Sequence, residues 1–266
     1  MNIIFPLIRP LRSWLGSAFL VVCVLFTATA IKAEAEYTFT LVADNTGPFS
    51  DFGAVPSPSL SALGTVAFNA TLDQGGRGVF SGNGGMVTTI ATTSLFNGAF
   101  GYPSINPAGT VAFQFSPGTV AGERILAGNG GPLATIADTA GQFQSFVTGC
   151  STSINASGTV AFWALPDSGP TGIFASNGGA ATPIVLSSAS LATGFNIAMN
   201  DAGTIAFRSS NETRIATTNG GLITTIVDNS GPLNYFGSAP SINNAGRGAF
   251  VAGVNGIDGV SRRNVA

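Results

Sequence analysis

Asn106-Pro107-Ala108-Gly109-Thr110-Val111-Ala112-Phe113 is one of five near-copies of a motif, Asn-x-x-Gly-x-x-Ala-Phe, that recurs through the chain. The copies are 45, 49, 45 and 43 residues apart, counted between their closing phenylalanines, Phe68, Phe113, Phe162, Phe207 and Phe250. A repeat of 43–49 residues that contains several short strands is typical of a β-propeller blade. One small sheet buries both of its faces only when neighbouring sheets stack on it. The repeat therefore predicts an all-β fold, a five-bladed β-propeller of four-stranded antiparallel blades.

The motif itself predicts a turn followed by a strand. Asn106 suits the first turn position, Pro107 the second and Gly109 the fourth. A ring of five ligand-binding asparagines is the alternative interpretation, and the turn is favoured because it explains every position. In the strand that follows, Val111 and Phe113 share one face, and Thr and Ala share the other. We expect the bulky face of each blade to pack into the shallow face of the next.

Further strands follow each motif. A third strand is predicted at Gly78–Phe80, Arg124–Leu126, Gly172–Phe174 and Arg214–Ala216. It runs into Asn-Gly-Gly, which predicts type I′ hairpins at Asn83, Asn129, Asn177 and Asn219. The fourth strand is predicted at Val87–Ile90, Leu133–Ile136, Thr182–Val185 and Ile223–Ile226. The crossings to the next blade are predicted to be loops whose phenylalanines plug the space between blades, at Phe52, Phe100, Phe146, Phe195 and Phe236.

The last repeat lacks a fourth strand, and the chain offers one at its other end. The segment from Tyr37 to Pro48 parallels the fourth-strand segment from Leu222 to Pro232. We therefore expect the N-terminal strand to join the last blade and close the ring, which removes an edge that would otherwise aggregate.

The first 35 residues predict an export signal. Arg9 and Arg12 precede an apolar run from Leu15 to Ala30, and Ala33-Glu34-Ala35 fits a signal-peptidase site. Residues 1–35 are thus expected to be a signal peptide and residues 36–266 a single propeller domain of five repeats. An uncleaved membrane anchor is the alternative. No second apolar segment follows, so we expect no membrane span after cleavage.

Charge excludes several kinds of function. Residues 36–266 hold seven arginines and eleven carboxylates, a net charge of −4, with no lysine or histidine. A basic surface for nucleic acid is therefore absent. Histidine-based catalysis and histidine metal sites are excluded as well, and we expect no metal site and no cofactor. Cys150 is the one cysteine in this part, so it forms no internal disulfide.

Asn106-x-x-Gly109-x-x-Ala112-Phe113 and its sister copies resemble the tandem repeat of the bacterial choice-of-anchor tandem repeat NxxGxxAF-containing proteins, a family associated with PEP-CTERM sorting. The resemblance covers essentially all of residues 36–266. It implies an exported bacterial protein, extracellular or periplasmic, and many members carry a C-terminal anchor. This chain ends without Pro-Glu-Pro or an apolar helix, so we expect a freely secreted protein or a truncated gene product. The resemblance implies no activity.

Three functions stay open. The first is non-catalytic recognition of an extracellular glycan or protein on the propeller face that carries Tyr102, Trp163, Arg208 and Tyr235, because aromatic residues and arginine are enriched at binding hot spots. The second is a carboxylate-dependent glycoside hydrolase, which needs two acids; Asp44, Asp138 and Asp228 recur at one repeat position. The third is a purely structural surface or matrix protein. No catalytic residue is assigned.

Overall fold

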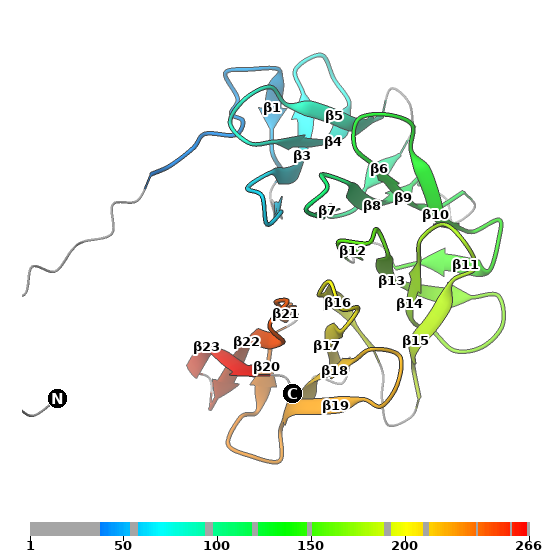
Figure 1. Ribbon diagram of the computed structural model, residues 1–266, viewed down its shortest axis with the longest axis vertical. Helices are drawn as coiled ribbons and strands as arrows, with labels where there is room; N and C mark the ends of the chain where they lie inside the picture. The colour runs from blue at the N-terminus through cyan, green and yellow to red at the C-terminus, as the bar shows by residue number, and fades with distance from the viewer. Residues whose placement is uncertain are drawn as a thin grey trace, which may run out of the picture. The chain divides into compact units, whose positions relative to one another are not determined.

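A computed structural model of the protein describes residues 38–53, 58–93, 98–118, 122–147, 151–188, 193–209, 213–237, 239–255 and 257–264. None of these residues is helical, and their strands form five antiparallel sheets in chain order (Figure 1). The predicted all-β class and one sheet per repeat are therefore confirmed. The predicted signal peptide, residues 1–35, lies outside the described residues.

The strands of the first three sheets follow one pattern. The first sheet has the order β1 (Phe49–Asp51), β3 (Val66–Leu72), β4 (Arg77–Gly82) and β5 (Thr88–Thr92), with β2 (Ser59–Leu60) also on β3. The second has β6 (Ala99–Phe100), β8 (Val111–Ser116), β9 (Arg124–Gly128) and β10 (Ala134–Asp138), with β7 (Ser104–Ile105) also on β8. The third has β11 (Phe143–Phe146), β13 (Val160–Pro166), β14 (Gly172–Ser176) and β15 (Thr182–Leu186), with β12 (Ser153–Ile154) also on β13.

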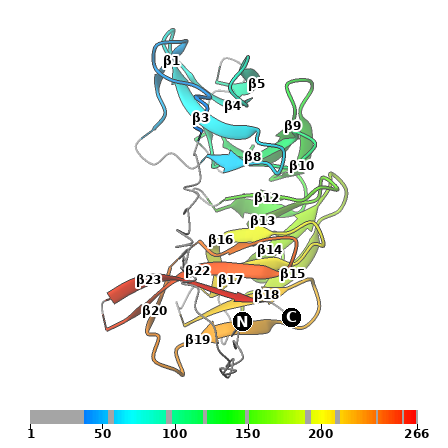
Figure 2. The ribbon, with the colours of Figure 1, turned by 60° about the vertical axis from the view of Figure 1, so that its left-hand side comes forward.

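The last two sheets differ slightly from the pattern of the first three. The fourth has β16 (Thr193–Met199), β17 (Ile205–Ser209), β18 (Arg214–Thr218) and β19 (Thr224–Asp228). In the fifth, β22 (Arg247–Val254) pairs with β20 (Tyr235–Phe236), β21 (Ser241–Ile242) and β23 (Ile257–Asn264). Figure 2 shows β22 and β23 as the longest ribbons of this sheet. The predicted second, third and fourth strands of the repeat are thus present, the fourth in the first four sheets.

The predicted crossover loops are partly wrong. Phe100, Phe146 and Phe236 end short strands, β6, β11 and β20, that pair with the second strand of their own sheet. The first strand of a repeat is therefore split into two pieces, such as β6 and β7, which both pair with β8. Phe146 and Phe236 are nonetheless fully buried, 3% and 0% exposed.

The motif forms the predicted turn. Gly109 N–H donates to the Asn106 carbonyl at 3.0 Å, and Gly109 has a φ of 80°. The equivalent bonds, at 3.0 or 3.1 Å, are made by Gly64, Gly158, Gly203 and Gly246. The Asn side chain adds a bond of its own, since Asn106 Oδ1 accepts from Thr110 N–H at 3.0 Å.

The hairpins after the third strands are not the predicted type I′ turns. That turn needs positive φ at two successive residues. In each Asn-Gly-Gly only the first glycine has one, from 95° to 105° at Gly84, Gly130, Gly178 and Gly220. Ser81 pairs with Thr88, so the connection is also longer than two residues.

Each sheet after the first packs its bulky face on the small face of the sheet before it, as the alternation predicts. Ala67 and Val79 of the first sheet pack with Val111 and Phe113 of the second. Equivalent hydrophobic cores join the second sheet to the third, the third to the fourth and the fourth to the fifth. These repeated interfaces are the hydrophobic core of the protein.

The N-terminal segment is not paired with the last sheet. Residues 38–43 carry no strand, and Val42 and Ala43 pack against Phe49, Phe68 and Phe80 of the first sheet. The structure therefore does not contain the predicted pairing, and closure by this segment stays a prediction.

Candidate functional site

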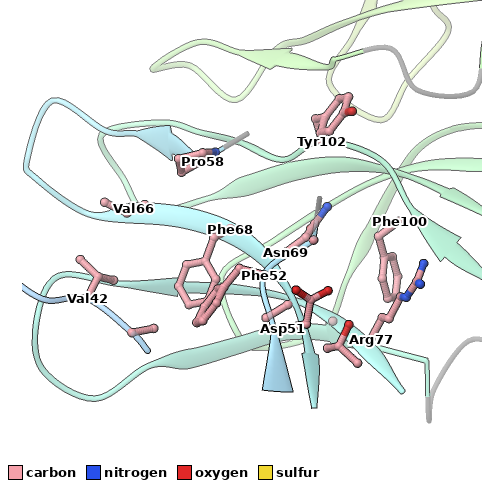
Figure 3. A pocket seen from close by; sticks show the side chains of 15 residues that line it. Val42, Asp51, Phe52, Pro58, Val66, Phe68, Asn69, Arg77, Phe100 and Tyr102 are labelled. Carbon is pink, nitrogen blue, oxygen red and sulfur yellow. The ribbon is translucent and has the colours of Figure 1, made fainter. Parts of the chain in front are cut away.

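A pocket of about 630 Å³ lies on the first sheet, where the chain crosses to the second. We call it the first-sheet pocket. Its walls include aromatic and polar side chains from β1, β3, β4 and the segment around β6, namely Asp51, Phe52, Phe68, Asn69, Arg77, Phe100 and Tyr102 (Figure 3). This volume lies in the range of about 300–1,000 Å³ that is usual for small-molecule sites.

The pocket exists because the segment that continues from β1 stops pairing with β3 after Phe52. In the second and fifth sheets, the glycine after the corresponding phenylalanine stays on the strand: Gly101 N–H donates to Gln114 O, and Gly237 N–H to Val251 O, both at 2.8 Å. Gly53 instead has a φ of 83°, and a Cβ placed on it would have no atom within 4 Å. The first repeat thus opens where two other repeats are closed.

Asn69 is the polar group at the centre of this opening. Its Nδ2 donates to the Gly101 carbonyl at 3.0 Å, which fixes the orientation of the amide. The opposite atom, Oδ1, is buried and has no hydrogen-bond partner among the described residues. An unsatisfied buried acceptor costs about 1–3 kcal/mol, and a ligand whose entry moved the surrounding side chains and gave this atom a donor would recover that free energy.

Aromatic rings form the apolar walls. Phe52 packs against Phe49 and Phe68, with ring centroids 5.6 and 5.9 Å apart. Phe100 lies on the other side of Asn69 and meets Phe113 edge-on at 5.6 Å. Tyr102 is half-buried, as are Phe52 and Phe100. Such walls suit a ligand with flat apolar faces.

The charged groups are at the exposed side of the pocket. Asp51 and Arg77 line it from β1 and β4, and both are exposed. A carboxylate only accepts hydrogen bonds and a guanidinium only donates them. Together with Asn69 they offer both kinds of bond to a polar ligand.

Of the four residues predicted to bind a partner, Tyr102 alone lines this pocket. Trp163 is half-buried and packs against the core that joins the third and fourth sheets. Arg208 is 7% exposed, and its Nη1 donates to the Phe236 carbonyl at 3.0 Å. Tyr235 is 41% exposed on β20. The structure thus distributes the four over several sheets.

Asn69, Trp163 and Arg208 share one repeat position, the residue directly after the motif. The full set is Asn69, Gln114, Trp163, Arg208 and Val251. Three of these side chains donate to a carbonyl of the next sheet, since Gln114 Nε2 also donates to Phe146 O at 3.5 Å. Asn69 and Gln114 are not among the predicted binding residues, although the variation of this position beside an otherwise regular motif is visible in the sequence.

The recurrent acids are used in local turns. Asp44, Asp138 and Asp228 accept from the backbone N–H two residues on, at 2.9, 3.1 and 3.0 Å. The hydroxyl of Thr46 lowers the pKa of Asp44, and the hydroxyl of Ser230 lowers the pKa of Asp228, each helped by the backbone N–H of the same residue. A lowered pKa keeps both carboxylates ionised, which does not suit a general acid.

Within the described ranges, no three His, Cys, Asp or Glu side chains are grouped so that they could hold a metal ion. The same residues contain no helix that is long and apolar enough to cross a membrane.

Comparisons with known proteins show the fold. The structure is similar to oligogalacturonate lyase from Vibrio parahaemolyticus, with a TM-score of 0.58 and 11% identity over 84% of this chain and 68% of the lyase chain. It is similar to a prolyl endopeptidase with a TM-score of 0.54 and 11% identity, over 81% of this chain and 35% of that one. The Aleuria aurantia lectin, a six-bladed β-propeller, matches at a TM-score of 0.46 and 14% identity, over 79% of this chain and 77% of the lectin.

At these identities the likeness concerns architecture and not activity. No curated protein matches the sequence. Residues 23–265 match a family of unknown function, DUF7453, and because this match spans nearly the whole sequence, the chain belongs to that family.

Proposed function

We propose that this chain is an exported, non-catalytic recognition protein, built as a five-bladed β-propeller, that binds a sugar in the first-sheet pocket. The observation that carries the proposal is a pocket with aromatic walls that is lined by Asn69, whose buried Oδ1 lacks a hydrogen-bond partner among the described residues.

A sugar ring matches this chemistry. Its hydroxyl groups donate to Asn69 Oδ1 and to Asp51, and they accept from Arg77. Its faces of C–H groups pack on the rings of Phe52, Phe100 and Tyr102. The fixed amide of Asn69, held by Gly101, gives the site a defined direction.

Binding is favoured over glycoside hydrolysis because the described residues that line the pocket include a single acid. A glycosidase needs two carboxylates across the scissile bond, and among the residues that line the pocket Asp51 is the only one with a carboxylate. Asp44, Asp138 and Asp228 belong to different repeats, and each is held in its own turn.

A glycan array, followed by calorimetry on each glycan that binds, tests the proposal. Asn69→Leu should abolish binding, because it removes the acceptor and keeps an apolar side chain of similar size. Gln114→Leu is the matched control: it changes the same repeat position in the second sheet and should leave binding intact. Loss of binding in Gln114→Leu or Tyr235→Ala alone would move the site away from this pocket.

Catalysis is tested on the same glycans. Incubation of each bound glycan with the protein should leave it unchanged. Turnover that disappears in Asp51→Asn, with binding retained, would replace recognition by hydrolysis. Export is tested separately, since the secreted protein should begin at Glu36.

A further inference from the structure

One face of the fifth sheet is uncovered where the same face of every earlier sheet is buried. Val260 lies opposite Val251 in the β22–β23 pair. The residues at the equivalent position in the first four sheets are at most 1% exposed, namely Val79, Ile125, Ile173 and Ile215, and each packs on the sheet that follows. Val260 is 82% exposed. A sheet of the same kind should therefore cover it.

The turn of the fifth repeat is uncovered in the same way. Asn106 and Asn200 are 3% and 6% exposed, and each donates Nδ2 to the carbonyl of the motif asparagine one repeat later. Asn243, the last of the series, is exposed. The fifth repeat thus presents the side that normally meets a following repeat.

The first sheet presents the complementary side. Its bulky face, with Phe49, Phe68 and Phe80, has no earlier sheet in the described residues, and Val42 and Ala43 pack on it instead. These two residues correspond in the repeat to Ile136 and Ala137 of β10, which pack on the third sheet. The N-terminal segment thus takes the place of a preceding fourth strand.

The glycines of the hairpins also place the N-terminal segment where a preceding fourth strand would lie. A Cβ on Gly130 would lie 3.6 Å from Thr89 O of β5, and one on Gly178 would lie 3.6 Å from Thr135 O of β10. Each glycine therefore sits over the fourth strand of the sheet before it. A Cβ on Gly84 would lie 3.5 Å from Leu41 O, and Leu41 occupies the repeat position of Thr89 and Thr135.

We infer that residues 40–44, which we call the closing segment, are the fourth strand of the fifth sheet and pair with β23, so that the uncovered face of the fifth sheet packs on the first sheet of the same chain. The repeat gives the register. Ala134 pairs with Ala127, Thr135 with Leu126, Ala137 with Ile125 and Asp138 with Arg124.

Transferred to the fifth sheet, this pattern pairs Thr40 with Arg262, Leu41 with Ser261, Ala43 with Val260 and Asp44 with Gly259, with a bulge at Val42. Asn243 Nδ2 then faces the carbonyl of Ser61, the first residue of the first turn. The closing segment also belongs to the wall of the first-sheet pocket, through Val42 and Ala43.

Disulfide trapping tests this pairing without any ligand. In a Cys150→Ser background, Leu41→Cys with Ser261→Cys should form a cross-link within a monomer, because the two residues are expected to be directly opposite. Leu41→Cys with Val260→Cys is the control and should not, since successive side chains in a strand point to opposite faces.

Hydrogen exchange on the unmodified protein gives a second readout. The backbone amides of β23 should exchange as slowly as those of β18, which is paired on both sides, and more slowly than those of the edge strand β19. A cross-linked dimer would assign the uncovered face to a second copy of the chain. Rapid exchange across β23, or equal cross-linking in both cysteine pairs, would overturn the pairing.

Discussion

At the scale of single residues, the asparagine of the motif combines two hydrogen-bonding roles, acceptor and donor, better than any other side chain. Its Oδ1 accepts from the backbone N–H four residues on. In Asn106 and Asn200 its Nδ2 also donates to the next repeat, as from Asn106 to the Asn155 carbonyl at 3.1 Å. Serine at position 61 keeps only the first of these bonds in the described structure, where Ser61 Oγ accepts from Thr65 N–H at 3.1 Å. The motif is therefore explained by architecture, and a binding ring of asparagines is not needed.

Asn106→Asp separates the acceptor role from the donor role. The carboxylate still accepts from Thr110, but it loses the donor and places a buried negative charge beside the Asn155 carbonyl. We expect a loss of about 1–3 kcal/mol in the free energy of unfolding, measured by urea denaturation. Asn129→Asp makes the same chemical change in an exposed hairpin and should cost little. Equal costs at both positions would contradict the role of the inter-repeat bond.

Gly109 is required for its backbone conformation and not for space. A Cβ there would have no atom within 4 Å, yet its φ is 80°. Gly109→Ala should therefore cost about 1–2 kcal/mol, the strain of a left-handed residue with a Cβ. Gly109→Asn should cost less, because asparagine tolerates this region better. If alanine and asparagine were equally destabilising by urea denaturation, steric crowding and not φ would be the cause.

At the scale of elements, the sequence predicts strands that repeat and misses features that differ between repeats. Val111–Phe113 and its sisters alternate strongly enough to set both the strand and its buried face. The two-residue strand β6 is too short to show a pattern, so the residues around Phe100 read as a loop. The pocket depends on where Gly53 turns away, a property of one repeat that the motif does not contain.

The candidate site was predictable only in part, because its residues also differ between repeats. Tyr102 stands out as an aromatic residue that breaks the repeat, and it does line the pocket. Arg208 stands out equally, but it bridges to Phe236 in a buried interface. The sequence cannot separate these two outcomes, because both residues break the repeat pattern and only three-dimensional packing decides which one meets an opening.

The turn at the end of β19 predicts a dependence on pH. Asp228 accepts from the Ser230 backbone N–H at 3.0 Å and from the Ser230 hydroxyl, and these bonds lower its pKa from the ordinary value of 3.8. The carboxylate therefore stabilises the fold above pH 3.8, and this contribution is lost as the pH falls through the lower pKa of the folded state. The stability difference between the protein and Asp228→Asn should shrink over that interval in thermal melts. A difference that stays constant below pH 3.8 would exclude the carboxylate as its source.

At the scale of the whole molecule, stability and ligand binding should depend on the same short segment. Each sheet is buried only by its neighbours, so an uncovered fifth sheet would leave a free edge and an exposed apolar face. The closing segment would remove both, and it also supplies Val42 and Ala43 to the first-sheet pocket. Closure and binding are then thermodynamically linked if the pocket binds its ligand more tightly in the closed state, because such a ligand favours closure.

Two proline variants test this link. Pro183 occupies in β15 the repeat position of Leu41, so the fourth strand does not need an N–H at that point. Because N–H groups along a strand alternate in direction, the N–H of the preceding residue faces the partner strand, and that residue corresponds to Thr40. Thr40→Pro should therefore destabilise the protein by about 1–3 kcal/mol in urea denaturation, and it should weaken sugar binding measured by calorimetry. Leu41→Pro should change neither quantity, since it reproduces Pro183. If the two variants behaved alike, the closing segment would not be paired in the proposed register, and if Thr40→Pro unfolded more easily yet bound normally, the pocket would be independent of closure.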